Sequence, residues 1–314
     1  MAINSFADKA VSFLEILGEA YVNDAKTAIL DDPTLATFFV GANKIQLPKI
    51  SLDGAGDYDR DAGYVQGGVS VSYEEYELRY DRGRKFRIDV IDNDEAAFDL
   101  YRQATMQYLR TKEIPEIDAI RFAAIYGAAS RSGTLGTVVK KDLAASDKPL
   151  KLFDAAEQKL NENEVPEEGR ILFCTNEFYA MLKADEAVSR RIDAGAATGN
   201  VDRRIALLDG MTPIVRVPQS RFYSEITLYD GKSENQTAGG FVPETGVSLP
   251  LNFIYGSRAA MKGVIKRSVS KIIEPQVNQS ADAYDIFYRV HHDLIVRDND
   301  TAAIYIHAKN TAVS

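Results

Sequence analysis

Apolar and polar residues alternate along residues 69–90 with the two-residue period of a β-strand. The apolar positions are first odd-numbered and then even-numbered: Val69, Val71, Tyr73, then Tyr76, Leu78, Tyr80, Phe86, Ile88 and Val90. The phase slip at Glu74–Glu75 predicts a β-bulge, and Gly83 is compatible with either a kink or a hairpin turn. One continuous strand of this length would extend about 70 Å, which favours a projecting arm over part of a compact domain.

Helical periodicity occurs on both sides of this segment. Residues 4–30 have the three- and four-residue spacing of an amphipathic helix. A longer helix is predicted over 93–127, with Asp92 and Glu95 as a capping box and a C-terminal end at Gly127. Pro115 predicts a kink within it, because proline removes a backbone donor. The first helix needs a docking surface elsewhere, since a short isolated helix is marginal in water.

The small, polar residues of 130–149 predict a boundary between domains. Beyond it, an alternation of elements predicts a separate α/β lobe. Its expected helices and strands are a helix at 152–162, a strand at 170–174, helices at 176–184 and 185–193, and strands in "TPIVRVP" and "EITLYD". The segment "KIQLPKISL" is predicted to be an edge strand, because it contains Pro48. The last third is rich in predicted strands, with a turn at 298–300.

Composition narrows the possible functions. The net charge of −9 and the pI near 5.0 argue against a general nucleic-acid binder, which requires a basic field. Cys174 is the single cysteine and lies in the apolar run "RILFCT", so we expect a small buried hydrophobe and no intramolecular disulfide. No apolar run approaches the roughly 18 residues of a membrane-spanning helix, and we expect no membrane partner.

Motifs for catalysis or cofactor binding are sparse. The segment "RSGTLGT" has neither the ending of a phosphate loop nor the spacing of a dinucleotide fold. His291 and Asp293 share one face of a predicted strand while His292 lies on the other, which leaves too few ligands for a closed metal site. We therefore expect no catalytic, cofactor-binding or metal site. An α/β enzyme that uses carboxylates of the middle lobe is the less favoured alternative.

A dense group of basic residues interleaved with acidic ones lies within the predicted arm. Mixed charges on an extended segment favour pairing with another protein chain, because complementary charges fix register and partner choice. A solvated strand edge protected against aggregation is the competing interpretation. The predicted contact residues are Arg79, Arg82, Arg84, Lys85, Arg87, Glu74, Glu75 and Glu77.

The order of these elements, together with "YDRGRKFRIDVIDNDEAAFD" and the C-terminal "YRVHHDLIVRDNDTAAIYIH", resembles the tailed-bacteriophage major capsid protein of the Hong Kong 97 type. This resemblance implies an α+β chain that comprises an N-terminal arm, an extended β loop, a peripheral domain with a long spine helix, and an α/β axial domain. The implied ranges are 1–42 for the arm, 43–91 for the loop, 92–148 for the peripheral domain, 149–250 for the axial domain and 251–314 for a return to the peripheral sheet. It also favours one long kinked strand through Gly83.

The resemblance implies a structural protein, not an enzyme, that self-assembles into pentamers and hexamers of an icosahedral shell around double-stranded DNA. The charged residues above would then make inter-subunit contacts. Implied partners are further copies, a separate scaffolding protein, a portal, decoration proteins and DNA held without sequence-specific contact. The implied location is the virion, assembled in the bacterial host cytoplasm. An encapsulin-type bacterial compartment is the alternative with the same fold.

The sequence departs from the family pattern in two ways, and each departure leads to an expectation. Only about 40 residues precede the extended loop, which suggests a separate scaffolding protein or none and argues against proteolytic maturation. Members that weld their subunits use a lysine, an asparagine and a glutamate. Lys44 and Lys49 lie in the arm, but the asparagine and the glutamate have no match, so we expect no covalent cross-linking.

Overall fold

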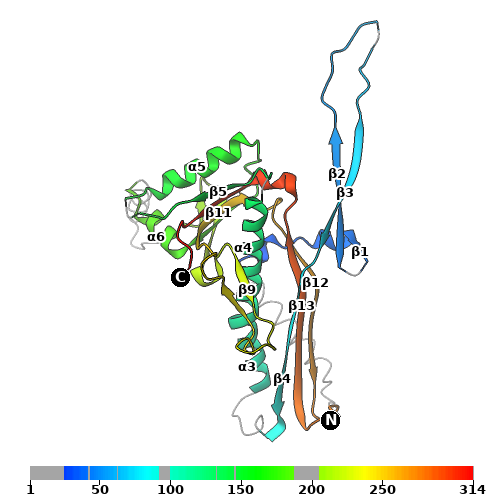
Figure 1. Ribbon diagram of the computed structural model, residues 1–314, viewed down its shortest axis with the longest axis vertical. Coiled ribbons are helices and arrows are strands. Elements are labelled where there is room, and N and C mark those ends of the chain that lie inside the picture. Colours follow the sequence, from blue (N-terminus) through cyan, green and yellow to red (C-terminus); the bar gives the residue numbers. More distant parts are fainter. Residues whose placement is uncertain are drawn as a thin grey trace, which may run out of the picture.

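The computed structural model describes residues 25–41, 43–61, 63–91, 100–131, 133–144, 146–186 and 205–313. Figure 1 shows three parts: an upper lobe around a six-stranded sheet, a lower three-stranded sheet beside a long helix, and a projecting hairpin. The predicted helix at 4–30, the capping box at Asp92 and the helix at 185–193 lie wholly or largely outside the described residues. Within those ranges, no helix combines the length and the apolar character needed to cross a membrane.

The six-stranded sheet draws strands from distant parts of the sequence. Its order is β5 (Thr137–Lys140), β14 (Ile304–Ala308), β11 (Leu251–Ser257), β6 (Arg170–Thr175), β8 (Thr212–Val217) and β7 (Leu207–Leu208). The β14–β5 and β6–β8 pairs are parallel, and the other pairs are antiparallel. Two predictions are thereby corrected. The polar segment 130–149 contains a strand of this sheet, and two strands of 251–314 belong here and not to the lower sheet.

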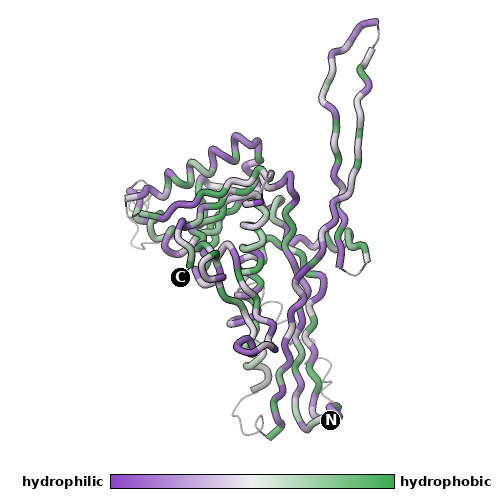
Figure 2. The backbone as a smooth tube through the Cα atoms, in the orientation of Figure 1, coloured by the Kyte–Doolittle hydropathy of each residue, from purple (hydrophilic) through white to green (hydrophobic). Residues whose placement is uncertain are grey.

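Helices cover both faces of this sheet. On one face α4 (Ile114–Ser130) packs against it, with the rings of Phe122 and Phe173 5.3 Å apart. On the other face lie α5 (Pro149–Glu162) and α6 (Asn176–Ala184). All side chains of β6 are buried, including Cys174, as predicted. Figure 2 shows apolar positions concentrated in this lobe, which is the main core of the chain.

The long helix is interrupted where the sequence predicts a kink. It comprises α3 (Leu100–Tyr108), a π-helical turn at Leu109–Glu113, and α4. Pro115 lacks the backbone N–H that would complete an ordinary α-helical bond, and the wider π turn immediately before it accommodates that loss. The predicted end at Gly127 is wrong, because the helix continues to Ser130.

The lower sheet is antiparallel in the order β12 (Lys262–Ile273), β13 (Ala283–Ile295) and β4 (Tyr80–Asp89). Gly83 lies inside β4 opposite Arg289, so it forms no hairpin turn. A Cβ at this position would lie 2.6 Å from the carbonyl oxygen of Tyr288, which explains the glycine. Tyr288 and Val290 face the long helix and pack in a cluster with its residues.

The projecting hairpin consists of β2 (Lys44–Leu52) and β3 (Val69–Glu77). Their register runs without interruption from the Lys44–Glu77 pair to the Leu52–Val69 pair, so the predicted bulge at Glu74–Glu75 is wrong. The chain leaves the hairpin after Glu77 and enters the lower sheet at Tyr80. The expected single strand over 69–90 is therefore two strands in two sheets.

The remaining elements are short. Strand β1 (Phe39–Val40) extends the hairpin sheet, and β9 (Ile226–Leu228) pairs with β10 (Phe241–Pro243). Within the described residues, four 3-10 helices connect the larger elements: Ala28–Leu30, Pro33–Phe38, Gln219–Arg221 and Asp298–Ala303. The predicted turn at 298–300 falls in the last of them, between β13 and β14.

Candidate functional site: the hairpin and the charged strand

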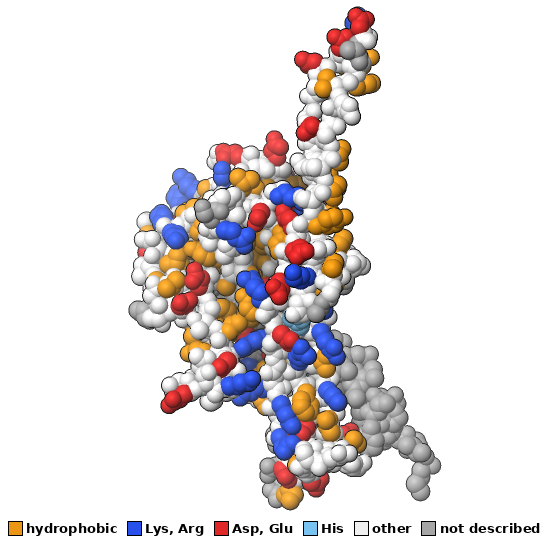
Figure 3. Space-filling model, turned by 45° about the vertical axis from the view of Figure 1, so that its right-hand side comes forward, with side chains coloured by type: hydrophobic (Ala, Val, Ile, Leu, Met, Phe, Trp, Pro, Cys, Tyr) orange, Lys and Arg blue, Asp and Glu red, His pale blue; other side chains and the backbone are white. Residues whose placement is uncertain are grey.

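The hairpin carries its apolar side chains on one face near the body and on the opposite face farther out. Near the body, Ile45 and Leu47 are buried in a cluster that also contains Leu78. Farther out the parity changes in both strands, and the apolar side chains lie on the other face. These outer residues are 56–70% exposed: Ile50, Leu52, Val69, Val71 and Tyr73. We call them the distal apolar face, and Figure 3 shows hydrophobic side chains along this part of the molecule.

The opposite side of the outer hairpin is polar. It carries Lys49, Ser51, Ser70 and Ser72, which share a face because they alternate with the distal apolar residues. The phase slip seen in the sequence thus marks a change in which face is apolar, and the hydrogen-bond ladder continues across it.

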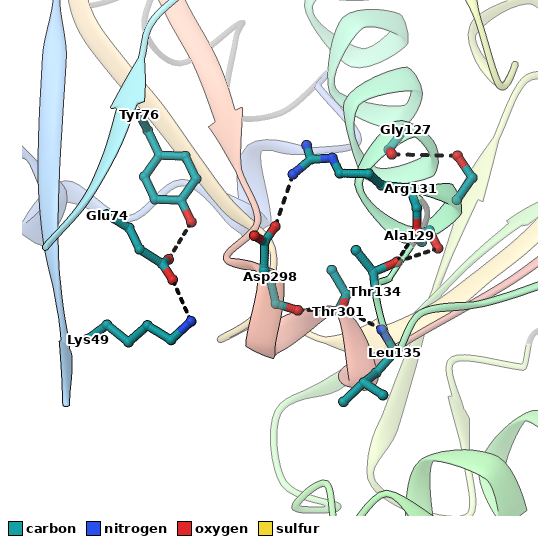
Figure 4. A network of polar contacts seen from close by, with 11 residues as sticks. Lys49, Glu74, Tyr76, Gly127, Ala129, Arg131, Thr134, Leu135, Asp298 and Thr301 are labelled. Atoms are coloured by element: carbon teal, nitrogen blue, oxygen red, sulfur yellow. Dashed lines mark hydrogen bonds and ion pairs between the residues drawn. The ribbon is translucent and has the colours of Figure 1, made fainter. Parts of the chain in front are cut away.

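Figure 4 shows the polar contacts near the root of the hairpin. The hydroxyl of Tyr76 donates to Oε2 of Glu74 at 2.7 Å, and Nζ of Lys49 lies 3.0 Å from Oε1 of Glu74. The Tyr76 hydroxyl and then Lys49 lower the pKa of the Glu74 carboxyl, whereas burial raises the pKa of Tyr76. On the body, Nη1 of Arg131 donates to Asp298 at 2.9 Å.

The predicted contact residues Glu75 and Glu77 also lie on the hairpin. Glu75 accepts from Nε2 of Gln46 at 2.6 Å, and the Nζ of Lys44 lies 3.3 Å from it. These two partners lower the pKa of the Glu75 carboxyl. Glu77 is exposed and stands opposite Lys44 in the ladder.

The segment Leu78–Arg79 fixes the chain where it passes from the hairpin to β4. Leu78 is 3% exposed, and its N–H donates to the carbonyl oxygen of Asn43 at 2.8 Å. The backbone N–H and the Nε of Arg79 both donate to Oδ2 of Asp293, at 3.1 and 3.2 Å. The hairpin is therefore held at its root, and Figure 1 shows its outer part projecting from the body.

The basic residues of β4 have partners within the same chain. On the helix side, Arg82 binds Glu116 at 2.6 Å and Arg84 donates to the carbonyl oxygen of Thr237 at 3.1 Å. On the other side, Lys85 and Arg87 both bind Asp285, at 2.8 and 2.7 Å. The two cations hold the pKa of the Asp285 carboxyl far below its usual range. This part of the predicted contact set thus stabilises the subunit's own sheet, and its inter-subunit role stays a prediction.

A buried ionic network, which the sequence reasoning missed, joins the long helix to the N-terminal segment. Arg121 is fully buried and donates from Nη2 to Asp31 at 2.5 Å, and Asp118 accepts from the N–H of Thr27 at 3.0 Å. Asp118 also binds Arg221 at 3.0 Å. The available signal was a pair of opposite charges one helical turn apart in the apolar stretch "EIDAIRFAAIYG".

The π-helical turn holds a buried carboxyl group. Glu113 is 3% exposed and accepts from the Tyr108 hydroxyl at 2.9 Å. Burial, and then the nearby carboxylate of Glu116, raise the pKa of Glu113 to about 7. Burial similarly raises the pKa of Tyr108.

The histidines of β13 are packed inside the fold. His291, His292 and Asp293 are all buried, and burial lowers the pKa of His292 to about 3. The ring of His292 stacks with Tyr80 at 6.0 Å between centroids. Among the described residues there is no cluster of three or more His, Cys, Asp or Glu side chains that could hold a metal.

No family model matches the sequence, and a search of curated proteins finds no match. Solved structures do resemble the chain. The capsid of cyanophage P-SCSP1u matches with a TM-score of 0.62 and 16% identity, over 88% of this chain and 85% of that one. The mature capsid of bacteriophage PhiM1 matches at 0.58 and 12%, over 86% and 83%. The capsid of Ralstonia phage GP4 matches at 0.55 and 11%, over 88% and 85%. The chain therefore has the fold of tailed-phage capsid proteins.

Proposed function

We propose that this chain, with its phage-capsid fold, is a major capsid protein that self-assembles into the pentamers and hexamers of an icosahedral head around double-stranded DNA. The observation that carries the proposal is the distal apolar face of the hairpin. Its five large apolar side chains are 56–70% exposed on a ribbon of two strands. Such a ribbon is marginally stable by itself, and a contiguous exposed apolar surface marks an interaction site.

A second copy of the chain is the natural partner for this face in a shell. The hairpin projects from one end of the molecule (Figure 1). In the proposed shell, the surface that receives it would therefore be a different part of the neighbouring copy. A contact between two different surfaces of identical chains repeats head to tail, and it generates rings when the rotation closes. Pentamers and hexamers are such rings.

The finer assignment is to the Hong Kong 97 type. In this reading the hairpin is the outer part of the extended loop, the long helix is the spine of the peripheral domain with the lower sheet beside it, and the six-stranded lobe is the axial domain. Residues 1–42 would form the N-terminal arm. Support comes from the order of these elements along the chain and from the capsid structures that share the fold.

The partners follow from the same proposal. A scaffolding protein, a portal and decoration proteins would complete the head, which forms in the cytoplasm of a bacterial host and becomes part of the virion. The net charge of −9 supports packaged DNA held without sequence-specific contact, because an acidic wall does not bind phosphate strongly. The role is structural, with no chemical step.

The test is assembly of the purified chain, followed by sedimentation and negative-stain microscopy. We expect pentamers, hexamers or closed shells that depend on concentration and salt. The control lacks the outer hairpin: residues 48–73 are replaced by a short glycine-rich turn, since the flanking Leu47 and Glu74 are partners across the ladder and the buried Ile45 and Leu47 are kept. This control should fold and remain unassembled. A parent chain that stays monomeric at high concentration, alone and with its scaffold, would contradict the proposal.

A further inference from the structure

The hairpin of β9 and β10 belongs to the upper lobe at its base and extends towards the lower sheet. At the base, the ring of Phe222 is fully buried and lies 4.7 Å from that of Phe122. The N–H of Ser224 donates to the carbonyl oxygen of Leu249 at 2.9 Å, so the chain leaves and re-enters the upper lobe at one place. Figure 1 shows this hairpin, in yellow, running down beside α4.

The loop at the end of the hairpin, residues 229–240, is shaped by an aspartate turn. Asp230 accepts from the backbone N–H groups of Lys232 and Ser233, at 2.8 and 2.9 Å, and from the Ser233 hydroxyl. The Ser233 hydroxyl, and then the two N–H groups, lower the pKa of the Asp230 carboxyl to about 2. The turn therefore keeps its charged acceptor at all but strongly acidic pH.

Arg84 crosses from the lower sheet into this loop. It lies on the helix side of β4, and its Nη2 donates to the carbonyl oxygen of Thr237 at 3.1 Å. A Cβ at Gly231 would lie 3.0 Å from Nη1 of Arg84, and one at Gly239 would lie 3.4 Å from it. Both glycines have positive φ, 71° and 66°, which other residues rarely adopt. The loop thus forms a glycine-lined seat for this one side chain.

A cavity of about 260 Å³ separates the loop from the long helix at this level. It is lined by Tyr229 and Gly240 from the loop, by Glu113 from the π-helical turn, and by Arg82 and Arg84 from β4. Because this space is not filled by packed side chains, the loop can move relative to the helix without disturbing a close-packed core. The hydrogen bond from Arg84 holds the loop at one separation from β4.

The position of this bond gives it leverage over the shape of the subunit. The long helix packs on both parts of the molecule, with Ile117 in the cluster of the lower sheet and Phe122 in the upper core. Contacts along a single helix resist rotation about its axis weakly. The bond between Arg84 and Thr237 joins the two parts away from that axis and therefore opposes such a rotation.

From this geometry we propose that Arg84 and the 229–240 loop form a latch that fixes the angle between the upper lobe and the lower sheet, and through it the curvature of the shell. In the proposed shell, the angle within each chain enters every repeated contact. A small change in the rotation per contact decides whether an assembly closes or stays open. The latch is a property of the single subunit, whereas its effect on curvature rests on the proposed function.

The first test measures the angle in subunits kept too dilute to assemble. Spin labels on Lys151→Cys in α5 and Lys271→Cys in β12, both exposed, report the distance between the two parts by pulsed electron paramagnetic resonance. Cys174 is buried and stays unlabelled. The parent should give one narrow distance distribution. Arg84→Ala should give one roughly twice as broad, because the rotation is then unrestrained.

Two further variants and a control separate the latch from a general loss of stability. Gly231→Ala obstructs the seat from the loop side and should broaden the distribution as Arg84→Ala does. Arg84→Lys keeps one donor without the planar fork and should restore part of the narrowness. The control is Arg289→Ala, which removes an ion pair with Asp81 inside the lower sheet and should leave the distribution narrow. Circular dichroism should show all of these chains folded.

The second test is negative-stain microscopy of unlabelled chains after assembly. The parent should form shells of one diameter, and Arg84→Ala should form shells of mixed diameter, tubes or open sheets. A distance distribution as narrow in Arg84→Ala as in the parent would overturn the latch. A broadened distribution together with uniform shells of the parent's diameter would overturn its effect on curvature. Failure of the parent to assemble would instead contradict the proposed function, while the distance measurement would still decide the latch.

Discussion

The six-stranded sheet and the projecting hairpin are both made of strands, but only the sheet is covered on both faces. Phe122 packs on one face and Phe153 on the other, and neither has any exposed surface. In the hairpin, Val71 and Tyr73 are 56% and 65% exposed. The sheet gains its stability within the subunit, whereas the outer hairpin can gain it only from a contact with another molecule.

The difference separates two kinds of mutational effect. A change in the covered sheet should reduce the free energy of unfolding of the subunit and thereby its assembly. A change on the distal apolar face should leave unfolding nearly unchanged and act on assembly alone. Measuring both quantities for each variant therefore tests whether the hairpin is an assembly element.

The largest effect on unfolding is expected for Phe173→Ala in β6. This fully buried ring contacts Phe122, and its removal leaves a cavity, at a cost of about 3–5 kcal/mol. Urea denaturation followed by circular dichroism measures the loss. A loss below about 1 kcal/mol would show that the upper lobe does not hold the main core.

A somewhat smaller effect is expected for Glu113→Gln, and it should depend on pH. Burial raises the pKa of the Glu113 carboxyl from 4.5 to about 7. The stability that this group contributes while protonated is therefore fully present below pH 4.5 and is lost as the pH rises through about 7. Glutamine stays neutral at every pH. Above neutral pH, the free energy of unfolding of the variant should therefore be about 2–3 kcal/mol higher than that of the parent.

Denaturation at pH 5 and at pH 8 measures this difference, with the exposed Glu225→Gln as the control. Equal pH dependence in the parent and in the Glu113 variant would contradict a buried carboxyl group that titrates near neutrality.

A still smaller effect on unfolding is expected for the paired change Val71→Ser and Tyr73→Ser. Both side chains are exposed, so the free energy of unfolding should change by no more than about 0.5 kcal/mol. Shell formation should nevertheless fall by about tenfold or more, because the apolar contact is repeated at every copy. Ser70→Ala with Ser72→Ala, on the opposite face of the same strand, is the matched control and should assemble normally.

No covalently joined subunits are expected when assembled particles are boiled in detergent and run on a denaturing gel. Lys44 and Lys49 already form ion pairs with Glu75 and Glu74, and the asparagine and glutamate of the cross-linking set have no match in the sequence. All protein should migrate at 34.7 kDa. A ladder at multiples of this mass would show that subunits are covalently joined.

Local patterns predicted the elements of the upper lobe well. The strand expected at 170–174 and the helix expected at 176–184 are present as β6 and α6, since a buried strand and an amphipathic helix each carry their own periodicity. Sheet membership was not predictable in this way. Strand β14 pairs with both β5 and β11, and β11 also pairs with β6, although these strands come from distant parts of the sequence. Their partners are chosen by packing, not by local composition.

The passage from β3 to β4 shows why the charged segment was harder to interpret. Tyr76, Leu78 and Tyr80 all occupy even-numbered positions. The alternation of apolar and polar residues therefore continues unchanged where the chain leaves one sheet for another. The visible slip lies four residues earlier and reflects a change of apolar face. The intramolecular partners of Arg82 and Lys85, Glu116 and Asp285, are likewise distant in sequence, and nothing in the local pattern indicated them.

The opposed faces of the hairpin have a kinetic consequence. If the outer ribbon bent back onto its own subunit, the side turned inward would be the polar one, with Ser51, Ser70 and Ser72, and the apolar side would remain in water. A newly made chain thus has little to gain by closing on itself. Its arm stays available until the concentration of copies is high enough for mutual capture, so particle formation should show a threshold concentration and a lag.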